Sequence, residues 1–229
     1  MNIIFDIGGT NFRYHIFDDS NNQLHIHNQP REDNVLEQLI DSLDKISIMY
    51  NIKYISVSIA GIVNDNKIYG CMNAGLEDDT LLIDSYKNIK INYINDGDAF
   101  ILGEINNFNI NINGKNILGI IFGTGVGCGL IMNGKLIKNC EIHKYFEDYM
   151  KKNKLTNYNI IQVCKFISNE LSRLIELLNL DYVIMNGYIN KFDLFEEFVR
   201  SFLSHNLYYN PKVIVSKFKY SNIIGLLIN

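Results

Sequence analysis

The chain has 229 residues, of which 47% are hydrophobic and 20% are charged, with only two prolines. This composition is typical of a globular protein that buries one large core or two ordinary ones. The net charge of −4 and the lack of a dominant Lys/Arg cluster argue against nucleic acid as the main partner. No stretch approaches the roughly 20 continuous apolar residues that span a bilayer, so we expect no membrane partner.

The sequence predicts a cytoplasmic protein. Its N-terminus enters a strand that contains Asp6 and lacks the basic and apolar regions of a signal peptide. The cysteines are scattered without close pairs, and reduced thiols are typical of a cytoplasm. We interpret them as small buried side chains; they are Cys71, Cys128, Cys140 and Cys164.

The first elements are apolar strands at 3–7 and 12–17, joined by the turn Gly8-Gly9-Thr10-Asn11. This pattern predicts a β-hairpin whose tight turn leaves backbone N–H groups bare. Asp6 ends the first strand, where a carboxylate can hold Mg²⁺ directly or through water. Asn11 at the end of the turn and Arg13 beyond it are placed to orient or neutralise phosphate oxygens.

The remaining first half predicts strands around an amphipathic helix. An Asn-rich stretch at 106–116, with Gly114 as a turn signal, is the expected boundary between an N-terminal lobe, 1–110, and a C-terminal lobe, 111–229. The expected elements are strands at 23–28, 54–59 and 89–94 and helices at 34–50 and 98–106.

The second half repeats this order, beginning with a hairpin and third strand at 118–138. Its turn reads Gly123-Thr124-Gly125, and rings of backbone N–H groups bind phosphates. Two such turns facing each other therefore predict a nucleotide site. Six of the 16 glycines fall between 119 and 134, which alone also fits an ordinary glycine-tolerant bend. The elements that follow are helices at 160–180 and 194–205 and strands at 182–185 and 212–215.

A βββαβα unit used twice indicates an internal duplication and an α/β fold with sheets flanked by helices. A third signal is the run Asn95-Asp96-Gly97-Asp98 between a strand and a helix. Asp96 is well placed there to accept a proton from an alcohol during phosphoryl transfer. The alternative is that Asp96 or Asp98 caps the helix N-terminus.

These motifs, Asp6-x-Gly-Gly-Thr-Asn, Asn95-Asp96 and the run at 122–135, resemble the ROK family of sugar kinases, repressors and open reading frames. The resemblance runs from Asn2 to about His143 and continues weakly to Gly225. It implies an actin/hexokinase-like (ribonuclease H-like) fold with duplicated lobes and an interlobe cleft. It also implies ATP- and Mg²⁺-dependent phosphorylation of a hexose or N-acetylhexosamine hydroxyl.

The resemblance also implies roles for individual residues. Asp96 would be the general base, and Asp6 would also hold Mg²⁺, directly or through water. The first phosphate turn would comprise Asp6, Gly8, Gly9, Thr10 and Asn11, and the second would comprise Gly123, Thr124 and Gly125. Gly187 would lie beside the adenosine. The sugar would be bound by Asn73, Asn95, Glu141 and His143.

The chain departs from the family pattern where zinc is usually bound. It reads Cys140-Glu141-Ile142-His143, one glycine short, and lacks the zinc-binding Cys/His segment, so it resembles a short form without structural zinc. Glu141 still reaches the sugar in this interpretation, whereas His143 fits an exposed residue equally well. No helix-turn-helix precedes Met1, which argues against the repressor branch.

Two alternatives to the sugar kinase remain open. One is a non-catalytic relative that senses nucleotide or sugar, and the other is a small kinase of the same superfold acting on pantothenate. Asp96 favours an enzyme, because a pure binding protein has no need of a carboxylate there. The sequence leaves the acceptor and the oligomeric state, including a homodimer, undetermined.

Overall fold

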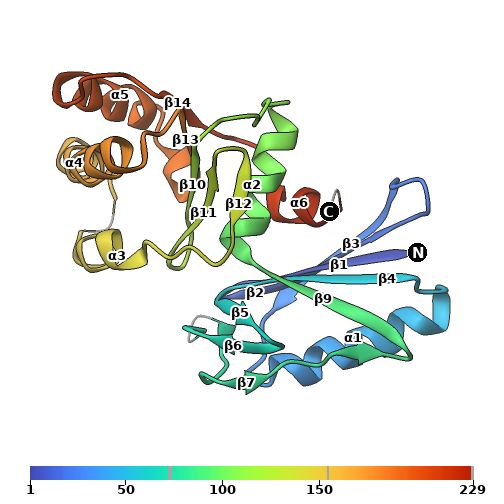
Figure 1. Cartoon of the computed structure of the whole chain (residues 1–229). Helices are drawn as coiled ribbons and strands as arrows, with labels where there is room; N and C mark the ends of the chain where they lie inside the picture. The colour runs from blue at the N-terminus through green and yellow to red at the C-terminus, as the bar shows by residue number, and fades with distance from the viewer. Residues whose placement is uncertain (72–73, 154, 228–229) are drawn as a thin grey trace.

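The computed structural model describes residues 1–71, 74–153 and 155–227, and it contains two main β-sheets. The N-terminal sheet has the order β3-β2-β1-β4-β9-β8 (Figure 1). In it, β1 pairs antiparallel with β2 and parallel with β4, and β4 pairs parallel with β9. The strands are β1 (Asn2–Ile7), β2 (Asn11–Phe17), β3 (Gln23–Pro30), β4 (Tyr54–Ile59), β8 (Ser85–Tyr86) and β9 (Ile89–Asn95).

Helix α1 (Val35–Met49) covers one face of this sheet, as its helical spacing of apolar residues predicted. The side chain of Asn34 caps it by accepting a hydrogen bond from the Glu37 amide. Its buried Leu39 and Leu43 pack in one cluster with Phe5 and Ile7 of β1. These contacts fix the strand that ends at the first glycine turn.

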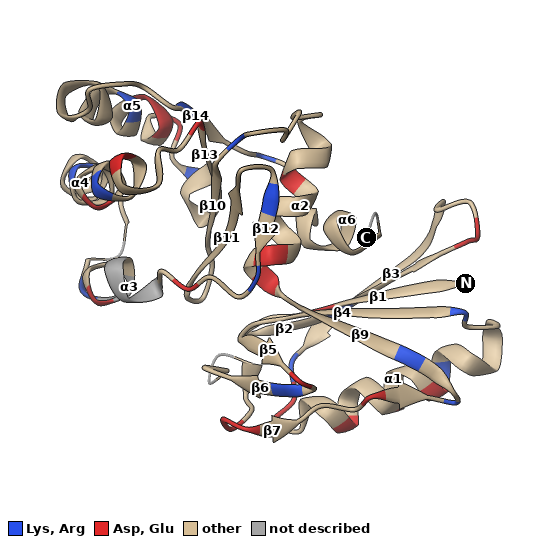
Figure 2. Cartoon of the chain, in the orientation of Figure 1, with Lys and Arg blue, Asp and Glu red and all other residues tan. Residues whose placement is uncertain are grey.

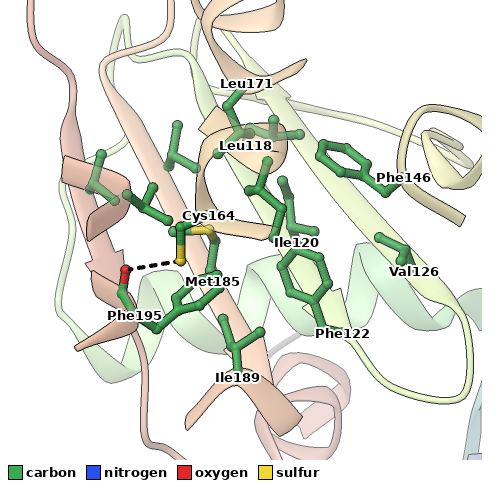
Figure 3. Close-up of a cluster of buried hydrophobic side chains, with 14 of the residues drawn as sticks. Leu118, Ile120, Phe122, Val126, Phe146, Cys164, Leu171, Met185, Ile189 and Phe195 are labelled. Atoms are coloured by element: carbon green, nitrogen blue, oxygen red, sulfur yellow. Dashed lines mark hydrogen bonds between the residues drawn. The ribbon is translucent and has the colours of Figure 1, made fainter. Parts of the chain in front are cut away.

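The C-terminal sheet has the order β12-β11-β10-β13-β14. Helices α3, α4 and α5 lie together on one side of it (Figure 1). Figure 3 shows the core between them, where Phe122 and Met185 from the sheet meet Cys164 and Phe195 from the helices. The elements are β10 (Ile117–Phe122), β11 (Val126–Met132), β12 (Lys135–Ile137), α3 (His143–Lys152), α4 (Ile160–Leu178), β13 (Tyr182–Gly187), the 3₁₀ turn Tyr188–Lys191, α5 (Phe195–Asn206) and β14 (Lys212–Val215).

The two sheets repeat one topology, since β3-β2-β1-β4-β9 matches β12-β11-β10-β13-β14 in order and direction. The predicted duplication and α/β class are therefore confirmed. Several short elements were not predicted from the sequence. These are a three-stranded sheet of β5 (Ile62–Asn64), β6 (Lys67–Tyr69) and β7 (Thr80–Leu81), strand β8, helix α3, and helix α6 (Ser221–Leu227).

Helices α2 (Asp96–Asn107) and α6 cross between the two sheets (Figure 1). Their crossing is close because small residues meet there: a Cβ on Gly225 would lie 1.9 Å from the Ala99 carbonyl oxygen. Helix α6 ends the chain yet packs against Ile4 of β1. The lobe boundary at 110/111 stays a prediction, and α6 would be an exception to it. Within the described residues, no helix combines the length and apolar character of a membrane span.

Candidate functional site at the junction of the two sheets

The two glycine turns meet at this junction. The hydroxyl oxygens of Thr10 and Thr124 lie 3.1 Å apart, although 114 positions separate them in the chain. Each turn closes on itself through a backbone hydrogen bond, from the Gly8 amide to the Asn11 carbonyl and from the Gly123 amide to the Gly125 carbonyl. The fold therefore brings the two predicted phosphate turns together.

Gly8 and Gly123 have open space where a side chain would stand. A Cβ on Gly8 would lie 3.9 Å from its nearest neighbour, and one on Gly123 would lie 4.0 Å away. Neither glycine has a positive φ. Neither internal packing nor backbone conformation therefore demands glycine at these positions, and the turns are sterically open to a ligand there. The Gly8 and Gly123 amides themselves donate within their own turns.

Other glycines of the same segment have a structural purpose. A Cβ on Gly129 would lie 2.2 Å from the Gly97 carbonyl oxygen, and one on Gly119 would lie 2.7 Å from Ile101. These glycines let α2 approach β10 and β11 closely. The glycine-rich run of 119–134 thus serves helix packing in part, which neither interpretation of the sequence anticipated.

Gly187 is also confined by the fold. It pairs with Phe122 at the end of β13 and has a φ of 109°. A Cβ there would lie 2.0 Å from the Phe122 carbonyl oxygen. Close strand packing accounts for this glycine, and its position beside an adenosine stays a prediction.

Asp6 is almost buried at the end of β1, with three polar partners. Its Oδ2 accepts a hydrogen bond from Arg13 Nη1 at 3.0 Å, and Asn222 Nδ2 donates to Oδ1 at 3.1 Å. Burial raises the pKa of Asp6, while the Arg13 charge and the bonds from Asn222 and Ser58 oppose that rise. Arg13 is therefore engaged by Asp6 in this structure.

Asn222 is a site residue that sequence analysis missed. It lies in α6, 216 positions beyond Asp6. Nothing around it matches a recognised motif, and α6 itself was not expected. Only the crossing of α6 onto the N-terminal sheet brings its amide to the carboxylate.

Asp96 is the first residue of α2 and half-buried, next to the second hairpin. A Cβ on Gly127 of β11 would lie 3.7 Å from its Oδ1. Burial first, then the negative charges of Asp6 and Glu141, raise the pKa of Asp96 to about 7. Figure 2 shows this concentration of acidic residues at the end of α2 nearest the N-terminal sheet.

The helix cap is neither Asp96 nor Asp98 but Asn95. Its Oδ1 accepts hydrogen bonds from the Gly97 and Asp98 amides at 2.9 and 3.1 Å. Its Nδ2 donates to the Gly61 carbonyl at 2.9 Å and to Glu141 Oε1 at 3.3 Å. The interpretation of Asp96 or Asp98 as the N-cap is therefore wrong, although Asp96 Oδ1 does accept a local hydrogen bond from the Gly97 amide at 2.9 Å.

The other predicted sugar residues are placed unequally. Glu141 is half-buried and lies beside Asn95. Asn95 is buried with its amide already engaged at four internal bonds, so its contact with a sugar stays a prediction. His143 begins α3, and the structure describes only its backbone. Asn73 lies outside the described residues.

The donor set suits Mg²⁺ better than zinc. Mg²⁺ is commonly held by one or two carboxylates, with substrate phosphates and water completing its shell, and Asp6 supplies a carboxylate beside the first turn. Over the described parts of the chain, no three His, Cys, Asp or Glu side chains group to hold a metal. The predicted absence of structural zinc remains a prediction, which elemental analysis of the purified protein tests.

Comparisons with known proteins bear on the family and the fold of the chain. The sequence profile of the ROK family matches residues 3–139. A ROK family glucokinase from Streptomyces griseus, solved with glucose and AMPPNP, superposes with a TM-score of 0.73 at 14% identity, covering 98% of this chain and 97% of that one. A putative N-acetylmannosamine kinase from Listeria monocytogenes gives a TM-score of 0.76 at 15% identity, covering 99% and 97%.

A ROK family transcriptional regulator, a homologue of the E. coli MLC protein, has the same fold. Its TM-score is 0.73 at 12% identity, and the match covers 98% of this chain and 76% of the regulator. No curated protein matches the sequence. Since the family profile covers more than half of the chain and the structures confirm the fold, the chain belongs to the ROK family.

Proposed function

We propose that this protein is a sugar kinase that transfers the γ-phosphate of ATP to a hydroxyl group of a hexose or an N-acetylhexosamine. Family membership supports a kinase or a regulator. Among proteins of the same fold, one was solved with glucose and AMPPNP, and another is described as a putative N-acetylmannosamine kinase. The position of Asp96 favours the kinase.

The main support for a kinase is the environment of Asp96. A general base works best when its pKa lies near the operating pH, and burial with two neighbouring negative charges raises the pKa of Asp96 to about 7. Asn95 caps α2, and the Asp96 carboxylate accepts its hydrogen bond from the neighbouring Gly97 amide, so the N-cap position does not account for this carboxylate. An ionisable group whose pKa is strongly shifted by burial and by neighbouring charges is typical of a catalytic site. We assign it to accept the proton of the acceptor hydroxyl.

The other residues have supporting roles in this proposal. The space beside Gly8 and Gly123 would receive the phosphates, which would bind turn amides other than these two, since both already donate within their turns. The Thr10 and Thr124 hydroxyls lie between the turns. Asn11 and Gly9 belong to the first turn, Gly125 to the second, and Gly187 to the adenosine side. Asp6 would hold Mg²⁺, which neutralises phosphate charge when it is bound.

Glu141 supplies the acceptor side with a hydrogen-bond acceptor next to Asn95. Asn73 and His143 remain proposed sugar residues on the family resemblance alone. Exclusion of nucleic acid, a cytoplasmic location and the oligomeric state are likewise predictions. The acceptor itself is to be found by a screen of hexoses, N-acetylhexosamines and pantothenate.

The test is Asp96→Asn, assayed for ADP release with the best acceptor of that screen. We expect the rate to fall by about 10²–10⁴-fold, because the amide keeps the shape but cannot accept the proton. Mg-ATP binding and the melting temperature should stay close to those of the unmodified protein. Asp41→Asn, at an exposed position on α1, is the matched control and should leave the rate unchanged.

A wild-type rate retained in Asp96→Asn would remove the base from the proposal. If the unmodified chain binds Mg-ATP but phosphorylates no acceptor, the kinase proposal fails and a nucleotide or sugar sensor takes its place. Phosphorylation of pantothenate alone would keep the base and replace the sugar.

A further inference from the structure

Asn139 ties the C-terminal lobe to the N-terminal lobe beside the proposed acceptor site. Its Oδ1 accepts a hydrogen bond from the Val63 amide at 3.1 Å, and its Nδ2 donates to the Val63 carbonyl at 3.0 Å. One side chain thus pairs with both backbone groups of Val63 in β5, as a neighbouring strand would. We call these two bonds the Asn139 clasp.

The backbone of Asn139 is held as well. Its amide donates to Asp98 Oδ2 at 2.8 Å, so α2 fixes the residue from the other side. Asn139 has a φ of 59°, a left-handed conformation that asparagine adopts more readily than most residues. Asp98 is 1% exposed, so this is a buried tether rather than a surface contact.

The clasp closes a ring of contacts around Glu141. Val63 and Gly61 lie two residues apart on one lobe, and Asn139 and Glu141 lie two residues apart on the other. The clasp connects Val63 to Asn139. Asn95 connects Gly61 to Glu141, because its side-chain amide donates to both the Gly61 carbonyl and the Glu141 carboxylate. Glu141 therefore has little freedom to move away from α2.

Such restraint is needed because like charges meet there. The negative charge of Glu141 raises the pKa of Asp96, so the two carboxylates repel each other when both are ionised. A short segment, from the end of β12 at Ile137 to Glu141, carries the glutamate. Without the clasp, that segment would relax away from Asp96.

We infer that Asn139, backed by Asp98, is a positioning residue that holds Glu141 in place for the acceptor. This inference rests on the proposed kinase function. It assigns Asn139 no contact with the acceptor, and it predicts that the clasp controls acceptor affinity and leaves the nucleotide side unaffected.

The main test is Asn139→Gly, which permits the positive φ and removes the side-chain bonds, with the added backbone freedom of glycine matched by a control substitution. We expect the KM for the acceptor to rise roughly tenfold, because the substitution removes the two Asn139–Val63 hydrogen bonds that hold the segment carrying Glu141. The KM for ATP should stay unchanged. Asn88→Gly is the matched control. Asn88 has a φ of 66° in the β8–β9 turn, far from Glu141 along the chain, and its replacement should alter neither KM.

A second readout needs no catalysis. Hydrogen exchange at the Val63 amide should become faster in Asn139→Gly, because its acceptor is gone. Unchanged exchange would show that the clasp does not form in solution and would overturn the inference. Faster exchange with an unchanged acceptor KM would overturn it too, since the clasp would then be structural only.

Asp98 provides an independent check. Asp98→Asn keeps an oxygen for the Asn139 amide and should keep the acceptor KM near its original value, whereas Asp98→Ala should raise it as Asn139→Gly does. Equal KM values in the two Asp98 variants would contradict the role of this tether.

Failure of the kinase proposal can be separated from failure of the clasp. If the unmodified chain binds a sugar by calorimetry but transfers no phosphate, weaker sugar binding by Asn139→Gly still supports the clasp. Equal sugar binding by the two proteins would contradict it. A chain that binds no sugar at all would overturn both proposals.

Discussion

The two hairpins share one path through space but differ at the positions that matter. In the first, Asp6 stands opposite Arg13, and the pair forms an ion pair. At the matching register of the second hairpin, Ile121 stands opposite Gly127. The first hairpin therefore carries charge towards the junction, whereas the second carries none at that level.

The difference continues two pairs further from the turn. The first hairpin has Ile4 opposite His15, and the second has Gly119 opposite Gly129. The glycines admit α2 against the second sheet, while Ile4 packs against α6 on the first. The two copies thus share one topology but differ below their turns: the first carries an ion pair, and the second is packed against α2.

The largest expected effect comes from disrupting the packing of α2 against β11. In Gly129→Val, a branched side chain would meet the backbone of Gly97 at a distance that no rotamer can relieve. We expect a loss of more than about 4 kcal/mol of unfolding free energy, or no folded protein at all. Thermal and urea unfolding followed by circular dichroism measures it. A normal melting temperature would show that α2 does not pack on β11 as described.

The same substitution at the turn should do the opposite. Gly123→Val places its side chain in open space, so stability should change by less than about 1 kcal/mol. The stabilisation by Mg-ATP should vanish, because the side chain blocks the approach of phosphate to the backbone. A thermal-shift assay with and without Mg-ATP compares the two. Retained stabilisation would mean that this turn is only structural.

This pair of glycines shows what the sequence could and could not reveal. The hairpins and the duplicated sheet order were predictable, because alternating apolar residues and turn glycines act locally. The pattern could not separate Gly123 from Gly129. That distinction depends on which face α2 covers, and α2 is fixed by contacts between distant segments.

The missed elements and residues have the same origin. Strands β5 to β7 are two or three residues long, too short for a periodic signal. Asn222 and Asn139 reach partners 216 and 76 positions away, so no motif records them. The local strand-to-helix junction is enough to single out Asp96 as a candidate base. The family resemblance assigns the neighbouring Asn95 to the sugar, whereas in the structure Asn95 caps α2.

A smaller effect, on the pH dependence of stability, is expected from the buried carboxylate of Asp98 in α2. Burial raises the pKa of Asp98 from its ordinary value near 4 to about 6, and its Oδ1 finds no hydrogen-bond partner among the described residues. Because the folded pKa lies above the unfolded one, Asp98 favours the fold at low pH, and that contribution is lost as the pH rises through about 6. Asp98→Asn should remove this dependence.

We expect Asp98→Asn to match the unmodified chain near pH 4 and to exceed it by about 3 kcal/mol above pH 7. Urea unfolding across that pH range measures the difference. A variant that is less stable at neutral pH would show that the ionised carboxylate is compensated by a partner, such as water, that outweighs its burial.

The smallest effect concerns the contact between the two hairpins. Thr10 and Thr124 are both exposed, and water competes for their hydroxyls, so their mutual hydrogen bond should contribute only about 0.5 kcal/mol. A double-mutant cycle with Thr10→Val and Thr124→Val isolates this coupling from the loss of each hydroxyl. The contact is small, but among the described residues it links side-chain hydroxyls of the two turns directly. A coupling of zero would show that the turns stand apart in the free protein, and the phosphate cradle would then form only when nucleotide draws the lobes together.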